Sequence, residues 1–297
     1  LLLDGLLGTG IKLPLRNEAA LVLQGVASIL VDLELTPLIV AVDCPSGVDC
    51  DTGACADETL PADLTITMAA VKQGLLKLPA FEYVGELECV EIGLPENLDS
   101  WNGLHMEVAD LEMVSAYLPE RTLASHKGTF GTALVIAGST SYTGAALLAG
   151  SAAYRVGVGL VNMAVPEPLY AALAGHIPEA TWVTLAHESG FISEHAVDVA
   201  LKNFDRATAI LIGPGMGNHP SSKKFIETLL PSIKIPSVFD ADGLRLLTQI
   251  SEWHKKLFAP AVLTPHPGEM SALTGLSRNE IQDNRQAVAE KYAKAWG

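Results

Sequence analysis

Two carboxylates follow strand-like runs in the first third of the chain. Asp4 comes directly after the apolar run 1–3, and Asp43 comes directly after the apolar run 38–42. Residues just beyond the C-terminal ends of neighbouring parallel strands share one crevice, so we expect these side chains to lie close together. Such a pair can transfer a proton, or it can bind a cation with help from the Ser46 hydroxyl. Each aspartate taken alone is equally well explained as the cap of a turn or a helix.

A small-residue loop near the middle of the chain gives the other strong signal. The apolar run 133–137 leads into residues 138–144, with the sequence Gly-Ser-Thr-Ser-Tyr-Thr-Gly, and we expect a helix rich in Ala and Leu from about Ala145. Unpaired backbone N–H groups at such a helix start suit an anion or a nucleotide-like ligand. We therefore expect a ligand above this loop.

Three further loops follow predicted strands in the same way and carry glycines, carboxylates and a histidine. They are residues 213–217 (Gly-Pro-Gly-Met-Gly), 240–244 (Asp-Ala-Asp-Gly-Leu) and 264–270 (Thr-Pro-His-Pro-Gly-Glu-Met). Taken singly, each has a structural explanation: a tight turn for 213–217, helix capping for Asp240 and Asp242, and a structural role for His266. Their convergence at strand C-termini favours a ligand site.

The elements that position these loops alternate between strands and helices, which predicts an α/β fold with parallel sheets covered on both faces. We expect a helix at 17–30 and strands at 1–3, 38–42, 64–67, 85–92, 133–137, 160–165, 209–212, 237–239 and 261–263. A chain of 297 residues has room for two domains. We expect a first domain over 1–95, a polar, turn-rich linker over 96–103 and a second domain over 104–297.

Composition and charge exclude several functional classes. A hydrophobic content of 49% with 18% charged residues is typical of a compact enzyme, and the net charge of −15 argues against nucleic-acid or anionic membrane partners. The 4 cysteines form no Cys-x-x-Cys pair, which disfavours a zinc site and a disulfide framework. No long uncharged apolar run and no signal peptide are present, so we expect a cytoplasmic protein, and we expect it to form a homo-oligomer.

The first third resembles a known domain through an ordered run of motifs. These are DGLLGTG at 4–10, AVDCPSGVDCDTG at 41–53, ADLTITMAAVKQGL at 62–75 and EIGLP at 91–95. Together they resemble the C-terminal half of the NAD(P)H-hydrate epimerase domain, the YjeF N-terminal domain, which has a Rossmann-like fold. The resemblance implies that Asp4 and Ser46 bind potassium. It also implies that the hydrated nicotinamide substrate contacts Asp43, a candidate catalytic residue, and the segment Gly8, Thr9, Gly10, Ile11, Lys12, Leu13 and Pro14.

The rest of the chain resembles the ADP- or ATP-dependent NAD(P)H-hydrate dehydratases, the YjeF C-terminal domain of ribokinase-like fold. The motifs that carry this resemblance are HKGTFG, AGSTSYTGAA, VGVGLV, IPEA, GPGMG, DADGL and TPHPGEM, in the order of the family. The resemblance implies that Ala145, Gly215 and His266 contact the hydrate, and we assign Asp242 to the same site. It also implies ADP or ATP with magnesium as cosubstrate and metal.

The two resemblances together imply a bifunctional enzyme of nicotinamide nucleotide repair. An epimerase would interconvert the R and S hydrates, NADHX and NADPHX, and a dehydratase would phosphorylate and eliminate the 6-hydroxyl of the S hydrate. The chain lacks an initial Met and the family's later Gly-x-Gly-Asp motif with its catalytic aspartate, so we expect a fragment without either end. Two alternatives remain: a ribokinase-like kinase of a small molecule such as a vitamin precursor, and a catalytically inactive nucleotide-binding protein.

Overall fold

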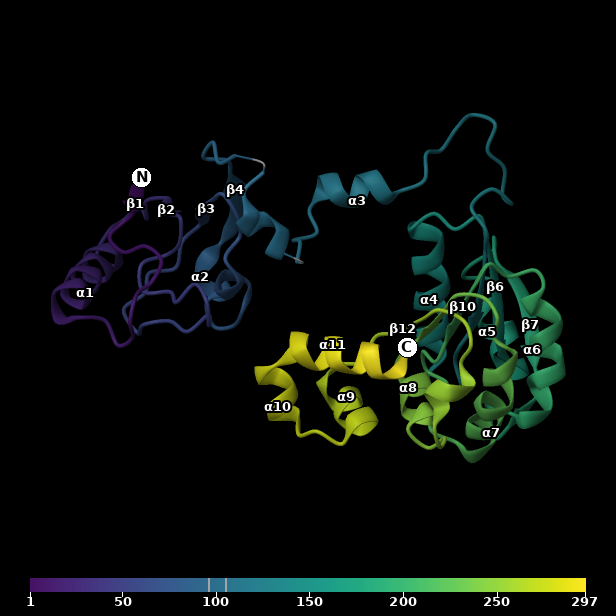
Figure 1. The fold of residues 1–297 in the computed structure, drawn as a ribbon. Helices are drawn as coiled ribbons and strands as arrows, with labels where there is room; N and C mark the ends of the chain where they lie inside the picture. The colour runs from purple at the N-terminus through teal and green to yellow at the C-terminus, as the bar shows by residue number, and fades with distance from the viewer. Residues whose placement is uncertain (96, 105) are drawn as a thin grey trace. The chain divides into compact units, whose positions relative to one another are not determined.

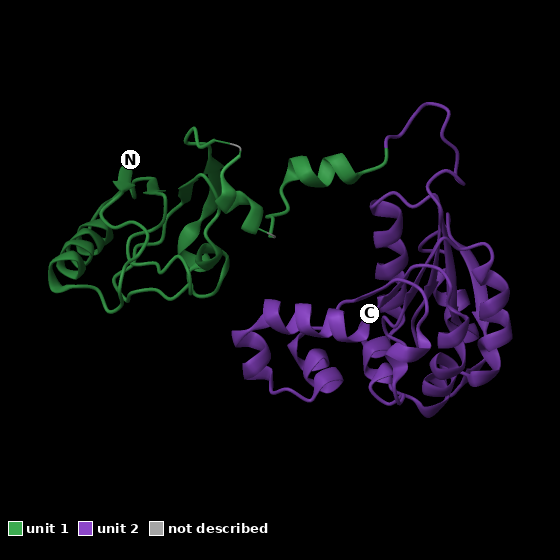
Figure 2. Cartoon of the chain, viewed as in Figure 1, with its two compact units in different colours: residues 1–119 green, residues 120–297 purple. Residues whose placement is uncertain are grey.

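The chain forms two compact units, Leu1–Pro119 and Glu120–Gly297 (Figure 2). The computed structural model describes residues 1–95, 97–104 and 106–297. Glu96, the first residue of the predicted linker, lies outside the described residues. The predicted domain limits at 95 and 104 stay a prediction.

The first unit contains a parallel sheet of four strands in the order β1-β2-β3-β4 (Figure 1). Its strands are β1 (Leu2–Asp4), β2 (Ile39–Val42), β3 (Leu64–Met68) and β4 (Glu86–Val90). All four predicted strands of this part are confirmed. The last is shorter than the predicted run 85–92 because Gly85, with φ of 65°, turns the chain just before it. Since the strands are parallel, β1, β2 and β3 end at the same edge of the sheet.

Helices and short turns complete the first unit. The predicted helix at 17–30 is confirmed as α1 (Asn17–Val31), and the shorter elements are η1 (Gln73–Leu76), α2 (Phe81–Val84), η2 (Asp99–Gly103) and α3 (Leu111–Tyr117). One buried cluster packs between the loop after β2 and the segment that holds η1 and α2; its members are Cys44, Val48, Cys50, Leu75, Ala80 and Val84. This packing fixes the loop that follows Asp43 against the body of the unit.

The second unit contains a parallel sheet of six strands in the order β12-β11-β10-β5-β6-β7. The five predicted strands are confirmed as β5 (Thr132–Ile136), β6 (Leu160–Pro166), β10 (Ala209–Ile212), β11 (Ser237–Phe239) and β12 (Ala261–Leu263). The sixth, β7 (Thr181–Leu185), was not predicted. It pairs with β6 alone, and its Thr-Trp-Val-Thr-Leu sequence lacks the continuous apolar run of a strand buried on both faces. A short hairpin follows, β8 (His187–Glu188) and β9 (Phe191–Ile192).

Two buried clusters cover the opposite faces of this sheet, because alternate residues of a strand point to opposite sides. Val135 belongs to the cluster under α4 (Thr143–Arg155) and α5 (Glu167–Leu173). Leu134 and Ile136 belong to the cluster under three helices, α6 (Val197–Phe204), α7 (Pro220–Leu229) and α8 (Asp242–Leu247). The predicted α/β class is therefore confirmed.

The C-terminal part adds a small helical layer. Its members are α9 (Pro267–Thr274), α10 (Arg278–Asp283) and α11 (Arg285–Trp296), and the shorter turns of the unit are η3 (Glu194–Ala196), η4 (Leu230–Ser232) and η5 (Trp253–Lys256). Met270, Ile281 and Val288 form the buried contact between the three helices. Within the described residues no helix is both long and apolar enough to cross a membrane.

Candidate functional site

Asp4 and Ser46, to which the resemblance assigns potassium, are in contact at the C-terminal edge of the first sheet. Asp4 is 6% exposed and Ser46 is fully buried. The backbone N–H of Ser46 donates to Asp4 Oδ2 at 2.7 Å, and the Ser46 hydroxyl donates to Asp4 Oδ1 at 2.5 Å. The Ser46 hydroxyl in turn accepts the backbone N–H of Leu7 at 2.9 Å, which ties the loop after β1 to the loop after β2.

This pair leaves a buried carboxylate without a positive neighbour. Among the described residues, no basic side chain lies within 4.0 Å of Asp4. A buried charge is costly unless it is compensated, and hydrogen bonds from Ser46 supply only part of the compensation. A small cation bound by oxygen atoms fits this arrangement.

Asp43 lies at the end of β2 and is held by a dense set of donors. Its Oδ1 accepts the backbone N–H of Met68 at 3.0 Å and makes a short ion pair with Lys72 Nζ. The ammonium of Lys72 also donates to Thr67 Oγ1 at 3.0 Å and to the Met68 carbonyl at 2.8 Å. Asp43 has a φ of 72°, in the left-handed region that Asp tolerates better than most residues.

The electrostatics of this cluster favour the ionised form of Asp43. Burial raises the pKa of Asp43, but the hydrogen bond from Lys72, the N–H of Met68 and the charge of Lys72 outweigh it, so the pKa lies below its ordinary value. Lys72 was not predicted from the sequence. The signal was its place in the motif ADLTITMAAVKQGL, four residues after the end of β3, where a lysine can reach back to the sheet edge.

The predicted substrate segment 8–14 runs between β1 and α1 without regular structure. Gly8 and Gly10 have open space where a side chain would lie, and Thr9 and Lys12 are exposed. The structure therefore leaves this segment accessible beside the Asp4–Ser46 pair, to which Leu7 joins it.

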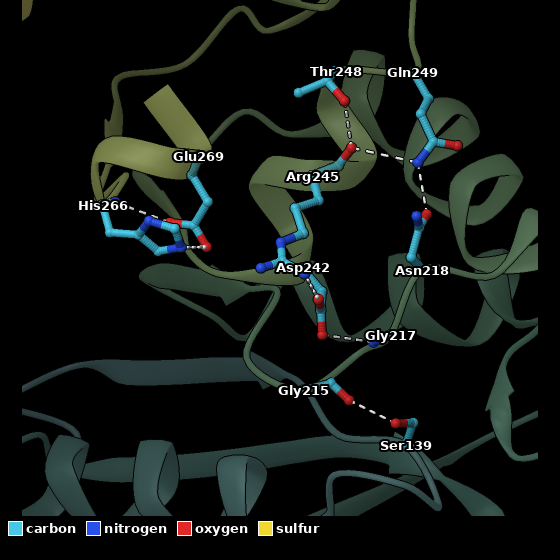
Figure 3. Close-up of polar contacts among 10 residues, drawn as sticks. All are labelled: Ser139, Gly215, Gly217, Asn218, Asp242, Arg245, Thr248, Gln249, His266 and Glu269. Atoms are coloured by element: carbon cyan, nitrogen blue, oxygen red, sulfur yellow. Dashed lines mark hydrogen bonds and ion pairs between the residues drawn. The ribbon is translucent and has the colours of Figure 1, made fainter. Parts of the chain in front are cut away.

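In the second unit, the loops after β5 and β10 interlock through backbone contacts. Gly138 N donates to the Pro214 carbonyl at 2.8 Å. The Ser139 hydroxyl donates to the Gly215 carbonyl at 2.8 Å (Figure 3). Gly215 has a φ of 66°, and a Cβ built there would lie 2.7 Å from Ala145 Cβ. Ala145 and Gly215 are therefore neighbours, and α4 begins at Thr143, two residues before the predicted start.

The loop after β11 joins the loops on either side of it. Asp242 Oδ2 accepts the backbone N–H of Gly217 at 2.9 Å, and Asp240 Oδ1 accepts the Thr264 hydroxyl at 2.7 Å. Neither aspartate caps α8, whose N-cap is Ala241 with no side-chain hydrogen bond. The capping explanation that the sequence left open is thus wrong for both, and the carboxylates cross-link the edge of the sheet instead.

His266 has a structural role and an exposed face. Its Nδ1 accepts the Gly268 N–H at 3.0 Å and caps α9, while its Nε2 lies 3.2 Å from Glu269 Oε1. Glu269 is 6% exposed and also accepts the backbone N–H of His266 at 3.0 Å. The imidazole is nevertheless 58% exposed, and it lines a cavity of about 330 Å³ together with Asn218, Arg245 and Gln249 (Figure 3).

The four predicted loops of the second unit thus meet along one edge, since β12, β11, β10 and β5 are adjacent. Ala145 contacts Gly215, Asp242 holds the end of the same loop, and His266 lines the neighbouring cavity. Three residues of the cavity wall were not predicted from the sequence: Asn218, Arg245 and Arg278. Only their positions near the loops could have indicated them.

Comparison with known proteins matches both units. A family model described as NAD(P)H-hydrate dehydratase matches residues 133–297, and one described as YjeF-related protein N-terminus matches residues 1–74. The chain is similar to a protein from Moorella thermoacetica named bifunctional NAD(P)H-hydrate repair enzyme Nnr, with 34% identity over 100% of this chain and 55% of that protein. A protein of the same name from Salinibacter ruber is 35% identical over 100% of this chain and 54% of its own length.

A solved ribokinase-like superfamily protein from Enterococcus faecalis is similar in fold over 63% of this chain and 66% of its own, with a TM-score of 0.50 and 21% identity. The chain spans about half the length of the curated relatives that it matches. Since the dehydratase model covers more than half of its residues, the chain belongs to the NAD(P)H-hydrate dehydratase family.

Proposed function

We propose that the chain acts in the repair of hydrated nicotinamide nucleotides, NADHX and NADPHX. The first unit would interconvert the R and S hydrates, and the second would take part in ADP- or ATP-dependent dehydration of the S hydrate to NADH or NADPH. One observation supports this proposal most strongly. In a chain of the dehydratase family, the loops that follow four adjacent strands lie at one edge of the sheet and are joined by hydrogen bonds, and these loops bring together Ala145, Gly215 and Asp242.

In the first unit, Asp43 and Lys72 have the chemistry that epimerisation needs. The lowered pKa of Asp43 keeps its carboxylate ionised near neutral pH, so it can accept a proton from a bound hydrate. The Lys72 ammonium beside it stabilises that ionised form and is 21% exposed, so it remains accessible from the crevice. The segment from Gly8 to Pro14, with open space above Gly8 and Gly10, would contact the substrate.

Potassium fits the pair Asp4 and Ser46. The buried carboxylate of Asp4 lacks a basic neighbour among the described residues. The Ser46 hydroxyl oxygen, which lies 2.5 Å from Asp4 Oδ1, would be a second oxygen ligand for the ion. When bound, the ion would compensate the charge of Asp4 at the end of the crevice. Asp4 and Ser46 would then hold the loop after β1 against the loop after β2, which begins at Asp43.

In the second unit, small residues and backbone shape the hydrate site. Ala145 and Gly215 present no large side chain, so the nicotinamide ring of the hydrate could approach the loop closely. His266 offers an exposed imidazole whose orientation is fixed by Gly268 and Glu269. ADP or ATP would supply the phosphoryl group that turns the 6-hydroxyl into a leaving group, and magnesium would offset its charge.

The remaining expectations have support of different kinds. The net charge of −15 supports small-molecule substrates rather than nucleic acid. The homo-oligomer and the cytoplasmic location stay predictions.

The proposal is tested by binding, with turnover as a second readout. We expect the chain to bind the S hydrate of NADH in calorimetry without any nucleotide. His266→Asn should weaken this binding by about ten-fold, a loss of roughly 1.4 kcal/mol. Asn is chosen because its side-chain oxygen can replace Nδ1 of His266 as the acceptor that caps α9, so only the imidazole is lost. His195→Asn, at an exposed histidine of η3, is the matched control.

Turnover is followed as NADH recovered in the presence of ADP or ATP with magnesium. Absence of hydrate binding by the unaltered chain would overturn the proposal. Equal binding by the His266→Asn variant would contradict the role of that residue.

A further inference from the structure

Of the nine residues that line the cavity beside His266, seven have polar or charged side chains. It measures about 330 Å³, and its wall is formed by Asn218, Arg245, Thr248, Gln249, His266, Gly268, Glu269, Ala272 and Arg278. This volume lies at the small end of the range for ligand sites, about 300–1,000 Å³. The cavity therefore suits one polar portion of a ligand rather than a whole dinucleotide.

The charge of the wall is positive, in a chain with far more acidic than basic residues. Glu269 is the one carboxylate in the wall, and its two oxygens already face the ring and the backbone N–H of His266. Arg245 faces Asp242 in Figure 3, and Nη1 of Arg245 lies 4.0 Å from Oδ1 of Asp242. Among the described residues, no carboxylate lies within 4.0 Å of Arg278.

Free hydrogen-bond donors accompany these guanidinium groups. Gln249 Nε2 donates to Asn218 Oδ1 at 2.6 Å, which directs the donor group of Asn218 elsewhere. Within the described part of the chain, that donor group has no protein acceptor. Arg278 lies over the backbone of Gly268, where a Cβ would come 3.3 Å from its Nη2. The cavity is therefore bordered by hydrogen-bond donors of Arg245, Arg278 and Asn218, and the one carboxylate of its wall, Glu269, is already engaged with His266.

Guanidinium groups recognise phosphate because their N–H donors match its oxygens in charge and geometry. A cation would be repelled by the two arginines of the wall. We propose that Arg245 and Arg278 bind a phosphate group of the dinucleotide substrate whose hydrated ring contacts His266. That the phosphate belongs to this substrate rests on the proposed function. Two groups share this chemistry, the bridging diphosphate and the 2′-phosphate of NADPHX.

The test compares Arg245→Gln, Arg278→Gln and the double variant in binding of S-NADHX, S-NADPHX and inorganic pyrophosphate. Each substitution should weaken binding about ten-fold, because it removes charge-assisted hydrogen bonds to the phosphate group. The effect should shrink as salt is raised. Arg206→Gln, at an exposed arginine after α6, removes the same charge outside the cavity and is the matched control. Thermal unfolding verifies that each variant folds.

The pattern of losses distinguishes the two sources of phosphate. A loss for NADPHX alone assigns the 2′-phosphate, and an equal loss for both hydrates assigns the diphosphate. Unchanged binding of all three probes by the folded double variant overturns the proposal. If the unaltered chain binds neither hydrate, the proposed function fails. Loss of pyrophosphate binding in the double variant would then still locate an anion site at the arginines, and unchanged pyrophosphate binding would overturn that as well.

Discussion

Charged side chains form the site of the first unit, whereas backbone and glycines form most of the site in the second. In the first, Asp43 accepts donors from Met68 and Lys72, and the buried Asp4 accepts two donors from Ser46. In the second, the loops meet through the carbonyls of Pro214 and Gly215 and the N–H groups of Gly138 and Gly217.

The difference follows from what each arrangement can tolerate. A charge network depends on the identity of each titratable group, because removing one partner leaves the other uncompensated. A backbone site depends on the absence of side chains, because a Cβ at a left-handed glycine is strained and displaces its neighbour. Substitutions that keep volume should therefore be most damaging in the first unit, and substitutions that add volume should be most damaging in the second.

The largest effect is expected for Asp43→Asn. The variant keeps the size of the side chain and suits the left-handed φ of 72°, so the fold should be retained while the proton acceptor is lost. Removal of a general base lowers a rate by about 10²–10⁴-fold, and we expect that loss in the conversion of R-NADPHX to the S form, measured by chromatography. Asp51→Asn, at an exposed position of the following turn, is the control. An unchanged rate in Asp43→Asn would show that Asp43 does not act as the proton acceptor.

Gly215→Ala should disrupt the second site to a smaller but still large extent. The new Cβ would meet Ala145 Cβ at 2.7 Å and the Tyr142 carbonyl at 2.8 Å, in a backbone with φ of 66°. Left-handed strain and overpacking together cost about 2–5 kcal/mol. We expect a lower thermal midpoint for the second unit and weaker binding of S-NADHX, with conversion of R-NADPHX unaffected.

Gly175→Ala is the matched control, since that glycine has open space at the Cβ position and no positive φ. If both glycine variants behaved alike, the close approach of the loops after β5 and β10 would not matter for binding.

Ser46→Ala should have an intermediate effect confined to the first unit. Loss of the hydroxyl leaves Asp4 with one donor instead of two and Leu7 N without its acceptor, which costs about 1–3 kcal/mol. The variant should require more potassium for half-maximal conversion of R-NADPHX, measured by titration of the ion against choline. Ser28→Ala, at an exposed serine of α1, should leave the potassium requirement unchanged. If Ser46→Ala needed the same potassium concentration as the unaltered chain, Ser46 would not take part in binding the ion.

The sequence predicted the parts of both units that depend on local pattern. Apolar runs marked the central strands, and their shared direction brought Asp4 near Ser46 and placed the loop that contains Gly215 beside Ala145. The edge strand β7 was not predicted because its Thr-Trp-Val-Thr-Leu sequence lacks a continuous apolar run. A strand whose pairing comes only from β6 depends on tertiary context that a local window does not contain.

The partners of the site residues could not be predicted in the same way. Lys72 reaches Asp43 over 29 positions of sequence, and Asp242 reaches Gly217 over 25. Such pairs depend on how loops curve after each strand ends, which no residue spacing encodes. The same reason explains why Asp242 could be predicted as a helix cap and yet hold a neighbouring loop.

The smallest effect, and the one that most directly tests charge in the first unit, is expected for Lys72→Met. In the unaltered chain, burial raises the pKa of Asp43. The hydrogen bond and charge of Lys72 and the backbone N–H of Met68 outweigh this effect, so the pKa lies below its ordinary value of 3.8. The stability gained from this shift is present above the unfolded pKa and is lost as pH falls through the folded pKa. Without the ammonium, the hydrogen bond and the charge of Lys72 no longer lower the pKa of Asp43, so we expect this pKa to rise.

The acidic limb of the pH profile for R-NADPHX conversion should therefore move to higher pH in Lys72→Met, while the rate well above that limb changes less. Lys77→Met, which removes an exposed ammonium bound to the Asp51 carbonyl, should leave the limb in place. A limb at the same pH in both variants would mean that the ion pair does not set the protonation of Asp43. The loop after β2 would then resemble the second unit, with its shape fixed by backbone contacts rather than by charge.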